Sequence, residues 1–139
     1  MTRAGNLCLS SAGAVLALAT SSDGRHPPEH IIDGNPHTLW ITTGTFPQEF
    51  IITLNALQKI GKITVESSQI RSLYIETSTS REPTHFERCV EREFEHVEGH
   101  FQNEEITVPG VQASHLRFVI VSGFEQFVAV RSVSAESVM

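Results

Sequence analysis

Residues 30–40 read His-Ile-Ile-Asp-Gly-Asn-Pro-His-Thr-Leu-Trp and contain a tight turn. Gly34 can take a positive φ, and Pro36 fixes the direction in which the chain leaves the turn. Such a turn directs carbonyl oxygens inward, and Asp33 and Thr38 add a carboxylate and a hydroxyl. Hard oxygen ligands gathered by one loop suit Ca²⁺, which takes about 6–8 of them. The same residues also suit an ordinary turn in which Asp33 caps its own backbone.

Two other kinds of metal site do not fit this stretch. An EF-hand that started at Asp33 would need glycine at its sixth position and glutamate at its twelfth, where the chain has Thr38 and Gly44. The neighbouring histidines lack the cysteines that accompany them at tight spacing in zinc fingers. Calcium therefore remains the metal to consider.

Beyond the turn, apolar and polar residues alternate with the period of two that is typical of β-strands. The run Leu116-Arg117-Phe118-Val119-Ile120 is long enough for a central strand. Further strands are expected over 50–54, 60–65, 73–76 and 128–133. Glycine, proline and asparagine predict turns at 22–24, 33–36, 109–110 and 122–123.

Two segments allow more than one interpretation. Residues 7–20 resemble a weak secretory signal, but serines and a glycine interrupt the apolar run, so two short strands joined by the Ser-Ser-Ala-Gly turn are preferred. Residues 86–97 are charged enough for an exposed helix, yet their alternation favours an edge strand. Its charges would deter pairing between the edges of two sheets.

Many short strands between turns predict an all-β fold, a β-sandwich or barrel, in a single domain over residues 1–139. Alternation does not choose between immunoglobulin-like and jelly-roll topologies. The Cys-Trp-Cys spacing of an antibody domain is absent, because Trp40 lies between Cys8 and Cys89 without that spacing. Two cysteines fit free thiols in a reducing compartment, with one disulfide as the alternative.

Composition and motifs argue against several function classes. The formal net charge is −6 with ten lysines and arginines, which disfavours nucleic acid and anionic membranes as partners. No G-x-S-x-G elbow and no phosphate-binding glycine loop occurs. The adjacent Glu104 and Glu105 would point to opposite faces of a strand, so they cannot flank one substrate. The chain is therefore expected to bind a partner and not to be an enzyme.

Residues 19–22, 28–35 and 38–40 together resemble the opening of galactose-binding-like domains, the family of discoidin and coagulation-factor C-type domains. This resemblance implies a jelly-roll β-sandwich whose Asp-Gly-Asn loop binds a structural Ca²⁺ with modest affinity. It also implies a backbone carbonyl from His30, a carboxylate from Asp33, a carbonyl from Asn35, a hydroxyl or carbonyl from Thr38, and a core position for Trp40.

The same family closes its metal site with a residue of the last strand, often glutamate. The equivalent residue here is Ser132, with the carbonyl of Arg131 beside it. Serine in place of glutamate removes one negative charge, which lowers the expected affinity. Glu136 is the alternative candidate for this position.

A closer resemblance covers most of the chain. Residues 7–11, 20–23, 26–29, 46–52, 98–99, 102–106, 116–118 and 133–136 are similar, in order, to the galactose-binding-fold subunits of the intraflagellar transport B complex. This family implies an adaptor of the cytoplasm and cilium that pairs with a Rab-like small GTPase subunit and other subunits of that complex. It also implies a role in ciliary export of signalling receptors and the Bardet–Biedl coat. The alternative is a discoidin-type lectin that binds sugar or lipid, for which Phe124, Phe127 and Arg131 are the nearest candidates.

Overall fold

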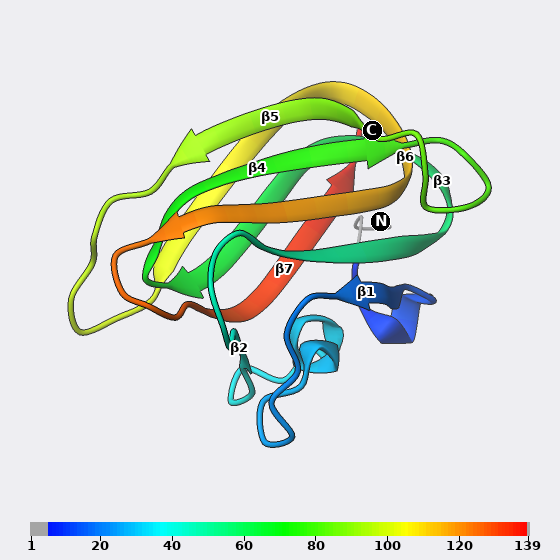
Figure 1. The fold of residues 1–139 in the computed structure, drawn as a ribbon. Coiled ribbons are helices and arrows are strands. Elements are labelled where there is room, and N and C mark those ends of the chain that lie inside the picture. The colour runs from blue at the N-terminus through cyan, green and yellow to red at the C-terminus, as the bar shows by residue number, and fades with distance from the viewer. Residues whose placement is uncertain (1–5, 139) are drawn as a thin grey trace.

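Two long strands, β3 (Gln48–Ser68) and β6 (Gln102–Gly123), organise the fold in the computed structural model, which describes residues 6–138 (Figure 1). They pair antiparallel along both of their halves, with Phe50 opposite Phe118 and Ile63 opposite Ile106. The register shifts between Thr53 and Gln58, where the pair bends from one layer of the sandwich into the other. The two strands therefore belong to both sheets.

The remaining strands complete two layers around this pair. They are β1 (Val15–Ala19), β2 (Trp40–Ile41), β4 (Ile70–Ser78), β5 (Glu87–Glu93) and β7 (Ala129–Ser137). One layer has the order β1-β3-β6-β4-β5, and the other has the order β2-β7-β3-β6. Two short 3₁₀ helices, η1 (Ser10–Ala12) and η2 (Pro28–Ile32), precede β1 and β2. The predicted all-β sandwich is thus confirmed.

The core lies between the inward faces of the two layers. Its aromatic centre is Trp40, Phe50 and Phe118, each at most 1% exposed. The ring of Phe50 meets Trp40 edge-on at 5.3 Å and stacks on Phe118 at 4.8 Å. The indole N–H of Trp40 donates a hydrogen bond to the carbonyl of Ser21 at 3.1 Å, so its one polar atom is satisfied. The core position expected of Trp40 is confirmed.

Residues 86–97 contain the predicted edge strand, which is β5. It has β4 as its one strand neighbour among residues 6–138 and ends before Phe94, whose side chain is buried. An exposed helix is excluded here because residues 87–93 pair with β4 as an antiparallel strand, with Glu91 opposite Tyr74 and Arg92 opposite Leu73.

Two local predictions were wrong. Residues 7–20 form one strand and not two, because 7–9 make only a single sheet-like contact, from the N–H of Leu7 to the carbonyl of Ala135. Pro109 and Gly110 do not end a strand. Thr107 pairs with Lys62 and Val111 with Ile60, so that three residues of β6 oppose one residue of β3. The turn chemistry there produces a bulge inside a continuous strand, with Gly110 at φ +69°.

No helix within residues 6–138 is long and apolar enough to cross a membrane.

The two cysteines are free thiols in different surroundings, as the sequence predicted. Cys8 is fully buried, and this burial raises its pKa to about 12. Cys89 lies half-buried on the edge strand, where burial also raises its pKa. For Cys8 the rise from 9.0 to about 12 lowers the thiolate fraction near pH 8 roughly a thousandfold.

At pH 8, iodoacetamide should therefore modify Cys89 while Cys8 stays unmodified, because the thiolate is the nucleophile and burial also blocks access. Peptide mass spectrometry after timed quenching would measure both rates. In denaturant the two cysteines should react at equal rates. A native Cys8 that reacts as fast as Cys89, or a Cys8–Cys89 disulfide, would contradict this assignment.

Candidate functional site

The Asp33 loop holds itself together through its own side chains. The chain leaves η2 at Ile32, and one carboxylate oxygen of Asp33 accepts the N–H of Asn35 at 2.9 Å. The other accepts the hydroxyl of Thr38 at 2.7 Å. The carbonyl of Asn35 accepts the N–H of Thr38 at 3.3 Å. Three of the predicted metal ligands are thus gathered by one turn that keeps its shape through internal hydrogen bonds.

Gly34 lets this turn approach the first residues of the chain. Its φ is +74°, as the sequence predicted, and an added Cβ would lie 3.2 Å from the side chain of Leu9. Both facts favour glycine, because other residues rarely adopt this φ and the space is tight. The loop therefore lies close to Leu9, the residue before η1, and leaves little room for a side chain at position 34.

A cavity of about 330 Å³ separates the loop from the outer face of β7 and β3. Its walls come from four segments: Asn6, Leu9, Ile31, Gly34, Asn35, Pro36, Glu66, Arg131, Ser132 and Ser134. Two of the five predicted ligands, Asn35 and Ser132, line this cavity although they lie far apart in the sequence. Asp33, Thr38 and His30 do not line it, and the imidazole Nδ1 of His30 lies 2.9 Å from the carbonyl oxygen of Leu39.

Glu66 is the acidic residue of this cavity that sequence reasoning missed. It lies on β3 directly opposite Ser132 of β7, and the serine hydroxyl donates to its carboxylate at 3.1 Å. Its other oxygen pairs with Arg131, whose guanidinium lies 4.3 Å from the ring centre of Phe101. Glu136, the alternative to Ser132, pairs with Lys62 at 3.3 Å and does not line the cavity.

The polar lining of the cavity consists of amide, hydroxyl and carboxylate groups and one guanidinium. Within residues 6–138 no group of three or more His, Cys, Asp or Glu side chains is placed to hold a metal ion. The donors present are hard oxygens, which suit Ca²⁺ and not a thiolate or imidazole metal.

The sequence matches the family model described as F5/8 type C domain over residues 17–132, which run from β1 through the Asp33 loop to Ser132. It is 53% identical to the human protein named intraflagellar transport protein 25 homolog over 131 residues, covering 94% of this chain and 91% of the relative. It is 36% identical to intraflagellar transport protein 25 of Chlamydomonas reinhardtii over 122 residues, covering 88% of this chain and 64% of that protein. The chain belongs to the F5/8 type C domain family.

Solved structures agree with this assignment at the level of the fold. The F5/8 type C domain described here superposes on a family 32 carbohydrate-binding module of Clostridium perfringens NanJ in complex with galactose, with a TM-score of 0.79. Sequence identity is 18%, and the match covers 94% of this chain and 97% of the module. Chitosan-binding module 1 of a Paenibacillus chitosanase/glucanase gives a TM-score of 0.78 at 19% identity, covering 96% and 99%. The jelly-roll prediction is confirmed.

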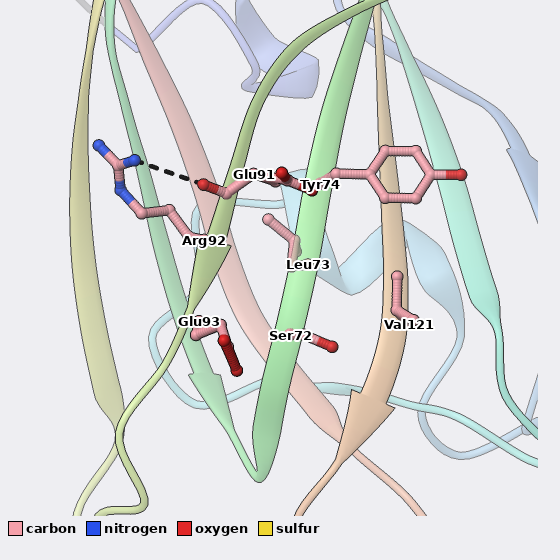
Figure 2. Close-up of a pocket in the computed structure, with 7 residues that line it drawn as sticks. All are labelled: Ser72, Leu73, Tyr74, Glu91, Arg92, Glu93 and Val121. Carbon is pink, nitrogen blue, oxygen red and sulfur yellow. Dashed lines mark hydrogen bonds between the residues drawn. The ribbon is translucent and has the colours of Figure 1, made fainter.

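A second hollow lies on the outer face of this F5/8 type C domain, between β4, β5 and β6 (Figure 2). Its volume is about 490 Å³, and it is lined by Ser72, Leu73, Tyr74, Glu91, Arg92, Glu93 and Val121. The guanidinium of Arg88 lies 3.7 Å from the centre of the Tyr74 ring and pairs with Glu91 at 3.2 Å. The hollow therefore combines an aromatic and an aliphatic wall with charges of both signs on the edge strand, from Glu91, Arg92 and Glu93.

Proposed function

We propose that this chain is a non-enzymatic adaptor subunit of the intraflagellar transport B complex, acting in the cytoplasm and cilium. The observation that carries the proposal is the 53% identity to human intraflagellar transport protein 25 homolog over nearly the whole length of both chains. Residues of both layers and of the Asp33 loop lie within that alignment, because it covers 94% of this chain. The acidic composition supports a protein partner over nucleic acid or an anionic membrane.

Its partner in this proposal is a Rab-like small GTPase subunit of the same complex. The chain has no phosphate-binding glycine loop, so any GTP chemistry belongs to that partner. The pair would support export of signalling receptors and the Bardet–Biedl coat from cilia. Immunoprecipitation of the tagged chain from ciliated cells should recover the B complex. Recovery of the chain without any of its subunits would refute the adaptor role.

A structural Ca²⁺ at the Asp33 loop is the second part of the proposal. The ligands would be the carbonyls of His30 and Asn35, the Asp33 carboxylate, Thr38 and Ser132. Glu66 is added as a carboxylate from the neighbouring strand, because it lines the same cavity as Asn35 and Ser132. Such an ion would connect an early loop to the last strand. Its affinity would be modest, roughly 10⁻⁴–10⁻³ M, because Arg131 already neutralises Glu66.

Calcium at about 10 mM should raise the melting temperature relative to EDTA. At a hundredfold excess over the dissociation constant, the stabilisation is about 2.7 kcal/mol, or roughly 10 °C for a chain of this size. Asp33→Ala should abolish the difference between calcium and EDTA, and Glu66→Gln should reduce it. Differential scanning calorimetry would measure these differences for each variant.

Two matched variants make this test specific. Glu136→Gln removes a carboxylate of the same last strand outside the cavity, and His30→Ala keeps the backbone carbonyl, so neither should change the calcium effect. If the melting curves of the wild-type chain in calcium and in EDTA coincide, the Asp33 loop is an ordinary turn and the proposed calcium site is refuted.

A lectin-like function is the alternative, and one observation favours it. A hollow of about 550 Å³ at one end of the sandwich is lined by the aromatic rings of Phe101 and Phe127 and by His96 and His100. Aromatic rings with nearby polar groups can bind a sugar. A glycan array with the purified chain would separate the two functions, since the adaptor should bind no glycan on it.

A further inference from the structure

The wall of the Asp33 cavity contains two charged residues, Arg131 of β7 and Glu66 of β3. Every other residue of that wall is neutral, so the lining as a whole carries no net charge near pH 7. The Arg131 side chain is 28% exposed and that of Glu66 is 30% exposed, so small ions in solution can reach the pair. The two charges of the cavity therefore compensate each other.

A register shift in β7 brings these two side chains together. Ser132 lies opposite Glu66, whereas Val130 lies opposite Ser67, so Arg131 is the extra residue between two paired positions. Such a bulge changes the direction of a side chain relative to a regular strand. Arg131 and its neighbour Ser132 both reach the carboxylate of Glu66. The ion pair is thus set by the backbone pairing of the two strands.

Both carboxylate oxygens of Glu66 already have partners. Oε2 pairs with the guanidinium of Arg131, and Oε1 accepts the hydroxyl of Ser132 at 3.1 Å. The guanidinium also lies 4.3 Å from the ring centre of Phe101, a cation–π contact that stabilises its position. A metal ion that used Glu66 as a ligand would therefore have to compete with Arg131.

The affinity of a protein for Ca²⁺ depends on how many charged oxygens its site offers. Arg131 lowers that affinity in two ways, because it occupies an oxygen of Glu66 and places a positive charge beside any cation in the cavity. With Glu66 held in this way, Asp33 is the one anionic ligand left among the residues proposed for the ion. Loss of the guanidinium would leave two.

We propose that Arg131 is a built-in cation that holds Glu66 in the calcium-free protein and competes with calcium for this carboxylate. The inference rests on the proposed calcium site and names the residue that regulates it. Without calcium, the guanidinium keeps the side chains of β7 and β3 connected at the cavity, so that the domain does not depend on the metal to stay folded. When calcium is added, Arg131 gives up Glu66 and keeps its contact with the Phe101 ring.

The test measures the calcium affinity of the full chain from its melting temperature across a series of calcium chloride concentrations at constant ionic strength. Arg131→Gln should bind calcium at least about fivefold more tightly than the wild type, because it frees one carboxylate and removes one repulsion. Arg81→Gln is the charge-matched control. Arg81 is exposed, forms no ion pair among residues 6–138, and lies between β4 and β5 in the other layer. This control should change the affinity less than about twofold, because salt screens distant surface charges.

A double-mutant cycle with Glu66→Gln separates competition for the carboxylate from general charge repulsion. In the Glu66→Gln background Arg131 has no carboxylate to hold, so Arg131→Gln should change the calcium affinity much less than it does in the wild type. An equal gain in both backgrounds would reduce Arg131 to a nearby positive charge and overturn the proposal. If Arg131→Gln does not fold, Arg131→Lys replaces it, since lysine lacks the planar fork that pairs with a carboxylate, and it should bind calcium at least about twofold more tightly.

Melting in EDTA gives a second readout that needs no bound metal. Arg131→Gln should melt below the wild type in EDTA, because Glu66 loses its cation, and saturating calcium should remove most of this difference. A deficit of the same size in EDTA and in calcium would mean lost packing alone and overturn the proposal. If calcium stabilises the wild type and Arg131→Gln has the same calcium affinity, this inference fails while the calcium site stands. If calcium stabilises neither protein, the calcium site is refuted and the role of Arg131 with it.

Discussion

Trp40→Ala should lower the free energy of unfolding by about 3–5 kcal/mol, the usual cost of truncating a fully buried large aromatic side chain. Trp40 is 0% exposed, contacts the ring of Phe50 and satisfies the carbonyl of Ser21. Its removal leaves a cavity where the exit of the Asp33 loop meets β3. Urea denaturation followed by far-ultraviolet circular dichroism would measure the change, since Trp40 is the single tryptophan and its fluorescence is lost with it.

Two companion variants test whether that loss of stability comes from the buried position of Trp40. Trp40→Phe keeps an aromatic ring and loses the indole hydrogen bond, so it should cost less than the alanine variant. Phe127→Ala removes a large aromatic that is 49% exposed and should cost less than about 1 kcal/mol. Equal destabilisation by Trp40→Ala and Phe127→Ala would contradict the placement of Trp40 at the centre of the core.

Much of the fold could be predicted from local patterns. Alternation placed a strand at Leu116–Ile120, because inward-facing positions must be apolar when one face of a sheet is buried. A short apolar run placed another at Phe50–Leu54, whose first three residues are all buried. Neither pattern revealed that 48–68 and 102–123 are each one strand that passes through both layers. Pro109 and Gly110 have turn chemistry in sequence. Only the register against β3 shows them to be a bulge.

The part of the candidate site that lies within one turn could be predicted from the sequence. The Asp-Gly-Asn turn forms within a few residues, so Asp33, Asn35 and Thr38 could be assigned together. Ser132 was reached through family resemblance, and the structure places it on the same cavity as Asn35. Glu66 could not be found, because it joins the cavity only through the pairing of β3 with β7, which no pattern within either strand specifies.

Residues 86–97 show the same limit, that contacts between strands cannot be predicted from the pattern within one strand. The charges of residues 86–97 predicted an edge strand protected against self-association, and β5 confirms the strand. The hollow beside it needs Tyr74 of β4 and Val121 of β6 as well. Sequence alone therefore gives the protective role of these charges, whereas the hollow depends on which strands become neighbours in the sheet.

Co-expression of the full chain with the Rab-like small GTPase subunit tests the adaptor proposal most directly. Gel filtration with light scattering should show one peak with the mass of a one-to-one pair. The chain alone should give no heat on titration with GTP, because it has no phosphate-binding loop. Separate elution of the two proteins at micromolar concentration, or GTP hydrolysis by the chain alone, would contradict the account.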